Sequence, residues 1–317
     1  MKTSVLIPAY NCSKTIRATL DSVLGQSAAP DEIIVLDDGS TDDTFSVVER
    51  YRPRVSVLRQ ANGGVAKARN VLWKRATGDL VAFLDSDDLW HPKYLEVQVR
   101  SFQEHPDAVA FFTGHVNFHG YDAYDWSTTT ADTLSPAELI EPLEFLKSYN
   151  THTGFFASMS YCCIPKRVFS LQEGDPFHEQ LDGVEDSFFF TSLPLLGYPV
   201  VYTSTPMVAY RFTGNSLSDN RVRAFGKWVN VFHFLEDRYS RAKPELRAAF
   251  RAAYAAKRRA YAKILMGAGD AVRARQQLRQ SVVNCRQPSS VAKSIGLLLL
   301  THMPRAAQPK WPSSSRQ

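Results

Sequence analysis

Residues 80–88 have the sequence LVAFLDSDD, in which an apolar run is followed at once by the carboxylates of Asp85, Asp87 and Asp88. A short apolar run bounded by polar residues is typical of a buried strand. Carboxylates this close together raise one another's pKa, and a divalent cation removes the repulsion between them. Their hard oxygen atoms suit Mg²⁺ or Mn²⁺. The stretch therefore predicts a strand that ends at a metal site, with an acidic turn that caps the next helix as the alternative.

The residues around this stretch alternate short apolar runs with helical patterns as far as about residue 104. Such alternation indicates an α/β fold with βαβ units and a mostly parallel sheet flanked by helices. Ligands bind at the carboxyl ends of parallel strands, so Asn11, Asp37 and Asp38 are expected at the same edge as the acidic stretch. The predicted strands cover 4–9, 32–36, 54–58 and 80–84, and the predicted helices begin near Ser13, Asp42, Gly64 and His91.

The later parts of the chain have a different pattern. The expected elements are a strand at 108–113, a loop at 121–133, helices at 136–148 and 185–196, and strands at 200–202 and 207–212. From 219 the pattern is helical to about 300. The expected organisation is a first domain at 1–218 with halves at 1–106 and 107–218, a basic helical extension at 219–303 and a disordered Pro/Ser-rich tail at 304–317.

The composition is that of a globular protein. Of the 317 residues, 44% are hydrophobic and 22% are charged, so global disorder is not expected. The apolar start at 5–7 is too short for a signal-peptide core, and the run at 295–300 is too short to span a bilayer, which needs about 20 apolar residues. A cytoplasmic protein is expected. The four cysteines form no C-x-x-C pair and are expected to be buried in a reducing compartment.

The formal net charge of +5 is unevenly distributed along the chain. Residues 238–279 contain twelve Lys or Arg and two Asp or Glu, whereas the rest of the chain has 25 basic and 30 acidic residues. A basic helical region can contact anionic lipid head groups or a nucleic acid. A solvated helix face in a region that packs against the first domain explains the same charges.

The sequence Pro8-Ala9-Tyr10-Asn11 stands at the end of the first predicted strand. Tyr10 offers a flat face on which a base can stack. A dinucleotide-binding fold would place G-x-G-x-x-G here, and its absence argues against a dehydrogenase. The chain also lacks G-x-x-x-x-G-K-[ST], so a P-loop NTPase is not expected.

Two glycine-containing segments, 37–42 (DDGSTD) and 62–70 (NGGVAKARN), follow the second and third predicted strands. Helix capping explains the later residues of the first segment but not the pair Asp37-Asp38, one of which could accept hydrogen bonds from a base or a ribose hydroxyl. The glycines allow the backbone to approach a ligand closely. Arg69 is a candidate to meet diphosphate charge, with an ordinary exposed helix face as the alternative.

Two further candidates lie in the second half of the chain. The segment 183–186 (GVED) begins a predicted helix. A carboxylate at a helix N-terminus is stabilised in its ionised form by the exposed N–H groups, so it would remain a base at neutral pH. Taken alone, this segment is a helix cap. Arg211 follows the last predicted strand as a candidate to contact phosphates.

The motifs P-A-Y-N, D-D-G-S-T-D, N-x-G-x-x-x-A-R-N, D-S-D-D and E-D, in this order and at these distances, resemble family 2 glycosyltransferases of the GT-A fold. The resemblance covers about residues 2–218 and implies a nucleotide-binding half at 1–106 and an acceptor half at 107–218. The family's R-x-H-x-x-S-x-S segment corresponds to 211–218, with Thr213 in the place of the His. The implied site has Pro8, Tyr10, Asn11 and Asp38 around the nucleoside, Arg69 near the nucleotide, Asp85 and Asp87 as the metal pair with Asp87 the more direct ligand, and Asp186 as the catalytic base.

The resemblance implies an enzyme that moves a sugar from a nucleotide-sugar donor, expected to be a UDP-sugar, to an acceptor hydroxyl. It also implies Mg²⁺ or Mn²⁺ and inversion at the sugar. A glycan or lipid-linked acceptor in bacterial surface polysaccharide assembly is the expected setting. The basic region would allow peripheral association at the inner face of the membrane, with packing of its helices against the first domain as the alternative that we favour. The alternatives are a sugar-phosphate nucleotidyltransferase and a non-catalytic nucleotide-sugar-binding protein. Nucleic acid is not an expected partner, because no recognisable RNA-binding motif accompanies the basic region.

Overall fold

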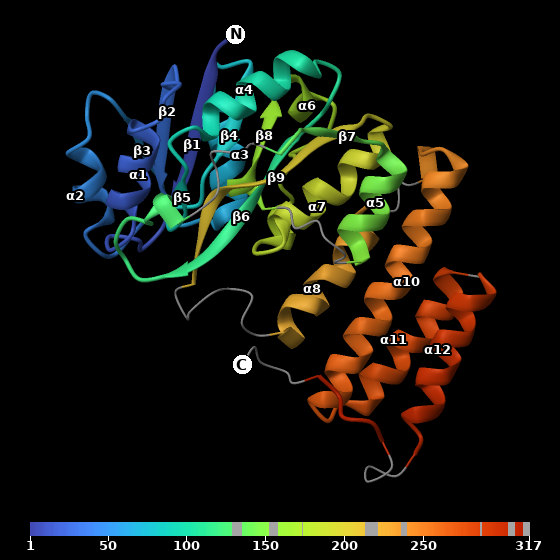
Figure 1. The fold of residues 1–317 in the computed structure, drawn as a ribbon. Helices are drawn as coiled ribbons and strands as arrows, with labels where there is room; N and C mark the ends of the chain where they lie inside the picture. The colour runs from blue at the N-terminus through green and yellow to red at the C-terminus, as the bar shows by residue number, and fades with distance from the viewer. Residues whose placement is uncertain are drawn as a thin grey trace. The chain divides into compact units, whose positions relative to one another are not determined.

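The computed structural model describes residues 1–128, 135–151, 158–172, 174–212, 221–235, 240–285, 287–303 and 308–312 (Figure 1). These residues form two compact units. The first consists of 1–141, 156–182 and 198–213. The second consists of 142–155, 183–197 and 214–317. The two units therefore differ from the expected division at 218, because two internal segments group with the C-terminal helices.

A nine-stranded mixed sheet forms the centre of the first unit, within the part of the chain that is described. Its strands follow the order β3-β2-β1-β4-β8-β6-β9-β5, with β7 paired to β9. The strands are β1 (Thr3–Ala9), β2 (Glu32–Asp37), β3 (Ser56–Arg59), β4 (Leu80–Phe83), β5 (Leu89–Trp90), β6 (Phe111–His119), β7 (Glu138–Ile140), β8 (Cys162–Pro165) and β9 (Val200–Phe212).

The first four strands are parallel, as the alternating pattern predicts. Beyond β4 the sheet is mixed, because β8 runs antiparallel to both β4 and β6, while β6 and β9 are parallel. The strand order reverses between β1 and β4, and the acidic stretch leaves β4 beside this reversal. Such a reversal of strand order is the kind of place at which α/β sheets bind ligands.

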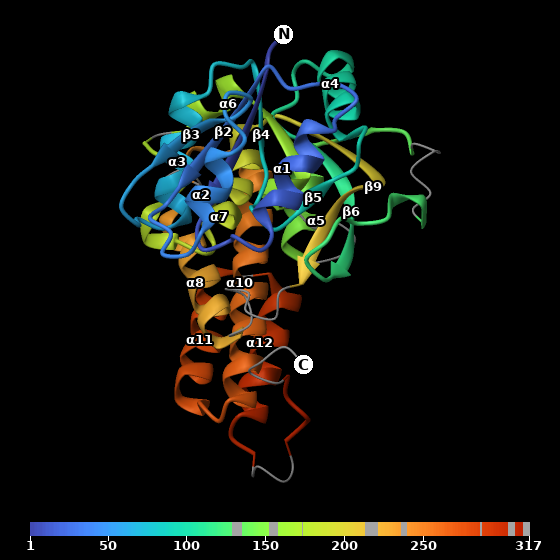
Figure 2. The same ribbon diagram turned by 90° about the vertical axis from the view of Figure 1, so that its left-hand side faces the viewer.

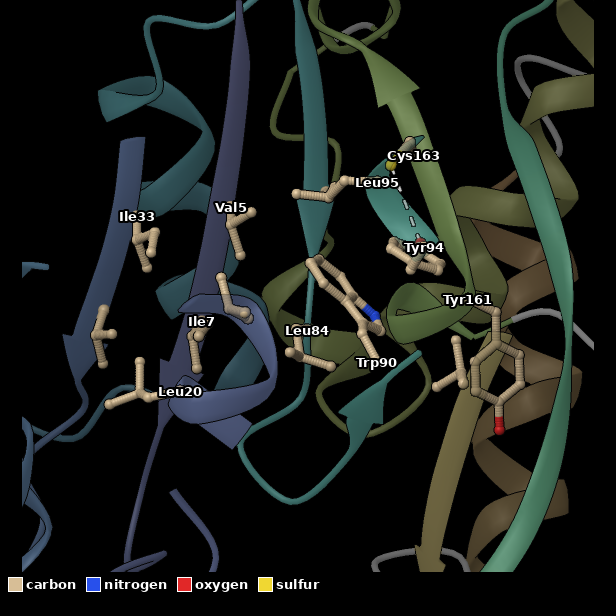
Figure 3. Close-up of a cluster of buried hydrophobic side chains, with 14 of the residues drawn as sticks. Val5, Ile7, Leu20, Ile33, Leu84, Trp90, Tyr94, Leu95, Tyr161 and Cys163 are labelled. Atoms are coloured by element: carbon tan, nitrogen blue, oxygen red, sulfur yellow. Dashed lines mark hydrogen bonds between the residues drawn. The ribbon is translucent and has the colours of Figure 1, made fainter. Parts of the chain in front are cut away.

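One face of the sheet carries the largest apolar cluster. Val5 and Ile7 of β1 alternate with residues that point to the other face, and they pack against Leu20 of α1 (Figure 3). Trp90 and Tyr94 stack with ring centroids 4.2 Å apart in the same cluster. The helices of this face are α1 (Ile16–Leu24), α2 (Thr44–Glu49) and α4 (Tyr94–Glu104).

The opposite face is covered by α3 (Val65–Arg75) and α6 (Lys166–Ser170). Trp73 of α3 stacks on Phe169 of α6 at 5.4 Å, and Phe83 of β4 meets Phe169 and Phe177 edge to face. Such aromatic pairs add to the stability given by their buried area. The parallel part of the sheet is therefore buried on both faces, as its apolar sequence predicts.

The second unit is helical (Figure 2). Its long helix α10 packs against α5, α8, α11 and α12. Phe232 of α8 stacks on Tyr254 of α10 at 4.8 Å. The described helices of this unit are α5 (Pro142–Thr151), α7 (Glu185–Ser192), η4 (Leu193–Leu196), α8 (Arg221–Phe234), α10 (Pro244–Gly267), α11 (Ala271–Asn284) and α12 (Pro288–Leu300).

Several predicted elements differ from the structure in the second half of the chain. The predicted helix at 136–148 is wrong at its start, because Glu138–Ile140 is the edge strand β7 and the helix begins at Pro142. The two predicted strands at 200–202 and 207–212 are one strand, β9. The sequence pattern gave no indication of β5 or β8. Short 3₁₀ turns η1 (Trp126–Thr128), η2 (Met159–Tyr161) and η3 (Glu179–Leu181) complete the described elements of the first unit.

All four cysteine side chains are buried, as expected. Burial raises the pKa of the Cys12 thiol to about 11 and raises that of Cys163 as well. Among the described helices, none has the length and apolar content needed to cross a bilayer. Of the expected disordered tail, residues 304–307 and 313–317 lie outside the described residues, and Pro312 lies beside Gly267 at the end of α10.

Candidate active site

The acidic stretch forms a loop between β4 and β5, and two threonines at the start of α1 hold its main chain. The Thr15 hydroxyl donates a hydrogen bond to the carbonyl of Ser86 at 2.9 Å. The Thr19 hydroxyl lies within hydrogen-bond distance of the carbonyls of Ser86 (3.1 Å) and Asp88 (3.0 Å). Because a hydroxyl has a single proton, Thr19 donates to one of them at a time. These contacts fix the loop on the side of α1.

Residues from much later in the chain fix the same loop. The N–H of Asp85 donates to Oγ of Ser160 at 3.0 Å. Arg211 of β9 donates from Nε to the carbonyl of Asp87 at 2.6 Å and from its main-chain N–H to the carboxylate of Asp88 at 3.1 Å. The fold therefore holds this loop in one conformation through its main chain, which leaves two of its side chains available for ligands.

The three carboxylates of the loop lie in different environments. Asp88 is fully buried, and burial raises its pKa well above the usual value. Asp87 is partly buried, and burial together with the charge of Asp85 raises its pKa to about 6. Asp85 keeps 28% of its side chain exposed. Asp85 and Asp87 are thus open to a ligand, whereas Asp88 connects the loop to β9. The helix-cap alternative is not supported, because Lys93 is the N-cap of α4.

Asp85 and Asp87 provide hard oxygen ligands of the kind that Mg²⁺ and Mn²⁺ prefer. Within the described ranges there is no group of three or more His, Cys, Asp or Glu side chains placed to hold one ion. Mg²⁺ is commonly bound by one or two carboxylates, with substrate phosphates and water completing its shell. The pair fits such an ion, because its mutual repulsion is relieved by a bound cation.

Arg69 lies beside this pair. It projects from α3, is buried, and places Nη2 2.5 Å from Oδ1 of Asp85. Its guanidinium also lies 6.0 Å from the ring centroid of Phe177. Arg69 therefore lies beside the acidic loop, and its expected contact with a nucleotide remains a prediction.

Asp38 is buried at the end of β2, and its carboxylate organises the segment before α3. Oδ1 accepts hydrogen bonds from Gln60 Nε2 (2.6 Å) and from the N–H of Gly63 (3.0 Å). Oδ2 accepts from the N–H of Gly64 at 2.8 Å. Gly64 has a φ of 87°, which favours glycine at this turn. In this structure Asp38 shapes a loop, and its contact with a nucleoside remains a prediction.

The ends of β1 and β2 are joined by side chains of the first two motifs. Asn11 has a φ of 47°, its N–H donates to Ser40 Oγ (3.0 Å), and its Oδ1 accepts from the N–H of Thr41 (2.8 Å). Pro8 is buried within β1. The ring of Tyr10 is half exposed, as stacking on a base requires. The structure thus brings Pro8, Tyr10 and Asn11 to the same edge of the sheet as Asp38.

Arg211 is more deeply placed than the sequence suggests. Its guanidinium lies 4.4 Å from the ring centroid of Phe118 and donates to the carbonyls of Gly120 and Asp122. It therefore connects β9 with the turn after β6, and its direct contact with phosphates remains a prediction. The rest of the expected segment, from Thr213 to residue 218, lies outside the described residues.

Asp186 belongs to the second unit, in the first turn of α7. Its Oδ1 accepts hydrogen bonds from the N–H (2.6 Å) and the hydroxyl (3.3 Å) of Ser187. The neighbouring Glu185 is buried and accepts from the N–H of Gly183 at 2.6 Å. Asp186 is the more exposed of the two carboxylates.

Sequence reasoning missed the residues that support the loop. Ser160 stands in a 3₁₀ turn without a recognisable motif, and its carbonyl also accepts a hydrogen bond from Trp90 Nε1 at 2.9 Å. Thr15 and Thr19 are one helical turn apart, a spacing that could have indicated that both side chains contact the same loop. Asp182 accepts from the N–H of Ala66 at 3.2 Å and so caps α3, because Gly64 has no side chain to do so.

The sequence model of Glycosyl transferase family 2 matches residues 4–169. The putative teichuronic acid biosynthesis glycosyltransferase TuaG of Bacillus subtilis (strain 168) is 32% identical over 238 residues, which cover 74% of this chain and 88% of TuaG. A chondroitin synthase of Escherichia coli is 29% identical over 184 residues. That match covers 55% of this chain but only 27% of the synthase, so this chain corresponds to a small part of that protein.

Two solved structures share the fold. Staphylococcus aureus TarS 1-349 in complex with UDP-GlcNAc aligns with a TM-score of 0.68 at 20% identity, covering 95% of this chain and 90% of that one. The mannosyltransferase PcManGT from Pyrobaculum calidifontis, in complex with GDP-Man and Mn²⁺, aligns with a TM-score of 0.60 at 21% identity, covering 96% and 81%. The family match and the shared fold agree with the motifs and the strand order, and the chain belongs to glycosyl transferase family 2, as a glycosyltransferase enzyme of the GT-A fold.

Proposed function

We propose that the enzyme transfers a sugar from a UDP-sugar to a hydroxyl of a glycan or lipid-linked acceptor, with inversion at the sugar, in bacterial surface polysaccharide assembly. The observation that carries the proposal is the fixed acidic loop, of which Asp85 and Asp87 are open to a ligand. The nucleotide sugars named with the two solved structures and the biosynthetic role in the name of TuaG support the classes of donor and product.

In this proposal Asp85 and Asp87 would hold a Mg²⁺ or Mn²⁺ ion, which would supply positive charge to stabilise the leaving diphosphate. Arg69 adds positive charge at the same edge of the sheet. The exposed ring of Tyr10 stacks on the base, while Pro8, Asn11 and Asp38 shape the pocket for the nucleoside.

Asp186 is the proposed general base. The acceptor oxygen forms a bond to the anomeric carbon of the sugar and passes its proton to Asp186. At the same time the bond between the anomeric carbon and the diphosphate breaks, and its electron pair leaves with the diphosphate. Two hydrogen bonds from Ser187 and the N-terminus of α7 favour the ionised carboxylate. Holding both substrates in one site supplies the orientation that the displacement needs.

The proposal is tested first by thermal denaturation of the full chain with nucleoside diphosphates, with and without Mn²⁺. A ligand that binds only the native state stabilises it by about 2.7 kcal/mol at about 100 times its Kd. We expect stabilisation by UDP that requires the metal and disappears in Asp87→Ala. The matched control Asp107→Ala, at an exposed aspartate, should keep the shift. A folded protein that responds to no nucleotide would contradict the donor site.

The same preparation tests the base. Asp186→Asn should keep the metal-dependent UDP shift and lose about 10²–10⁴-fold in transfer rate. Glu179→Gln, at an exposed carboxylate a short way before it, should keep both. Full transfer by the Asp186 variant would refute the assignment. Release of pyrophosphate from a nucleoside triphosphate would instead indicate a nucleotidyltransferase.

A further inference from the structure

The last described helix, α12, leaves part of its apolar surface exposed. Its buried side chains are Ser290 and Ser294, followed by Thr301 just after its end, whereas Val291, Leu297, Leu298 and Leu300 are half-buried. At the opposite positions of the helix it exposes Ile295 and Leu299. A helix at the surface of a globular unit normally buries its apolar stripe, so an exposed isoleucine and an exposed leucine on one side of it are unusual.

Hydrogen bonds fix the rotation of α12 with Ile295 and Leu299 exposed. Arg259 of α10 places Nη1 2.8 Å from Ser290 Oγ and 3.3 Å from Ser294 Oγ. Ser281 of α11 donates to Ser294 Oγ at 2.8 Å, and Arg275 reaches the carbonyl of Thr301 at 3.5 Å. Rotating the helix to bury its apolar side would remove these bonds and leave polar groups without partners, which is costly in a buried place.

The exposed side of α12 is continuous. Its apolar residues recur at helical spacing along one stripe, and the two that bracket Leu299 in this stripe are Ile295 and Met303. Leu299 is 65% exposed, Ile295 46% and Met303 41%. We name the exposed residues Ala292, Ile295, Gly296, Leu299 and Met303 the α12 stripe.

The C-terminal part of the sequence, which contains the α12 stripe, carries charges of one sign. From Ala271 to Gln317 the chain contains eight Lys or Arg and no Asp or Glu. Lys293 of α12 and Arg279 of α11 are both exposed. An apolar stripe flanked by cations is the pattern of a helix that lies in the plane of an anionic bilayer surface, where the cations meet lipid phosphates.

We infer that the α12 stripe is a docking surface for an anionic lipid bilayer. The helix has 13 residues and would lie in the interface with Ile295, Leu299 and Met303 among the acyl chains. A second copy of this chain is a poorer occupant, because the sequence from Ala271 onward has basic but no acidic residues, and two such surfaces would repel each other.

This inference deepens the proposed function, since a lipid-linked acceptor would then be reached at the same bilayer. Only the statement about the lipid-linked acceptor rests on the proposed function. Binding to the bilayer is measured without donor or acceptor, so a negative result there leaves the transfer proposal standing, and loss of transfer leaves the docking surface standing.

The test is co-sedimentation of the full chain with vesicles of equimolar phosphatidylglycerol and phosphatidylcholine, and with vesicles of phosphatidylcholine alone. We expect binding to the anionic vesicles that weakens with salt. Leu299→Glu should weaken it about tenfold or more, because the variant loses an apolar contact and adds a like charge. Lys293→Gln should weaken it about fivefold. The matched control Leu139→Glu, at a leucine of β7 with 46% exposure, should bind as the unchanged protein does.

Each outcome has a clear meaning. Because Leu299 is exposed, its variant should melt at the same temperature as the unchanged protein, which separates docking from folding. Equal binding by Leu299→Glu and the unchanged protein would overturn the inference, as would an absence of binding to anionic vesicles. If sedimentation velocity showed a dimer that Leu299→Glu makes monomeric, the stripe would be an interface between copies instead.

Discussion

At the scale of single residues, the ion pair between Arg69 and Asp85 joins the α3 side of the sheet to the acidic loop. Arg69→Met would leave Asp85 charged beside an apolar group, and it should lower the free energy of unfolding by about 2 kcal/mol. Urea unfolding measures this change. Arg75→Met, at an exposed position of the same helix, should change stability by less than about 0.5 kcal/mol. Equal effects of the two substitutions would show that the pair contributes nothing.

The local sequence predicts that an acidic site exists but not how its three carboxylates divide their roles. Asp85, Asp87 and Asp88 look alike in the sequence. What separates them is Arg211, which is 123 residues away from Asp88 and meets it only because β9 crosses beside β5. The same applies to Ser160, whose contact with Asp85 depends on tertiary structure rather than on a motif. Polar residues at strand ends are therefore predictable from the sequence, and the residues that support them are not.

At the scale of helices, the packing of α8 on α10 buries a lysine. Lys257 is 2% exposed, its Nζ lies 3.9 Å from the ring centroid of Trp228, and burial lowers its pKa to about 7. Burial disfavours the charged form, whereas the aromatic ring attracts it. The helical unit therefore holds a titratable group whose charge state changes near neutral pH.

This burial makes stability depend on pH. Between about pH 7 and the ordinary pKa of lysine, the unfolded chain binds a proton that the folded chain does not, so the stability should rise with pH. The slope should approach about 1.4 kcal/mol per pH unit, and below about pH 7 the cost is present in full. Urea unfolding from pH 7 to 10 checks this.

Lys257→Met should be more stable near neutral pH and should lose the slope that this lysine contributes. Lys263→Met, at an exposed position of α10, should retain it. A slope that survives in the Lys257 variant would assign the pH dependence to other groups.

Some helices and strands could be predicted from sequence patterns, and others could not. Apart from β5, the strands and helices up to α4 follow from their apolar periodicity, because each is buried against the sheet in the usual way. By contrast, Glu138–Ile140 forms the edge strand β7 through pairing with β9, a partner about sixty residues later in the chain. The exposure of Ile295 and Leu299 on α12 likewise could not be read from its composition, because hydrogen-bonded serines fix which side of the helix is buried.

At the scale of the whole molecule, the chain passes between its two units several times. Segments 142–155 and 183–197 belong to the helical unit although they precede residue 218. Phe145 and Leu146 of α5 are fully buried, and α5 packs against α10. A chain of residues 1–218 would therefore retain α5 and α7 without the helices that cover them.

We expect the chain of residues 1–218 to aggregate on expression, because an exposed apolar surface of this kind promotes association. Size-exclusion chromatography and a thermal melt measure this directly, with the full chain as the control. A monomeric 1–218 with a cooperative melt would instead support the expected domain boundary. The expected boundary at 218 rests on the motifs, which end near that residue. Motifs carry no information about which helices pack over a given segment.

The burial of all four cysteines makes the protein suitable for site-specific labelling. A thiol reacts as its thiolate, and the raised pKa of Cys12 and Cys163 keeps these two protonated at neutral pH, while burial shields Cys162 and Cys285 from reagents. A single cysteine introduced at an exposed position would then take up a maleimide dye without removal of the native ones. Placed on α12, an environment-sensitive dye would report the polarity around that helix directly by its emission.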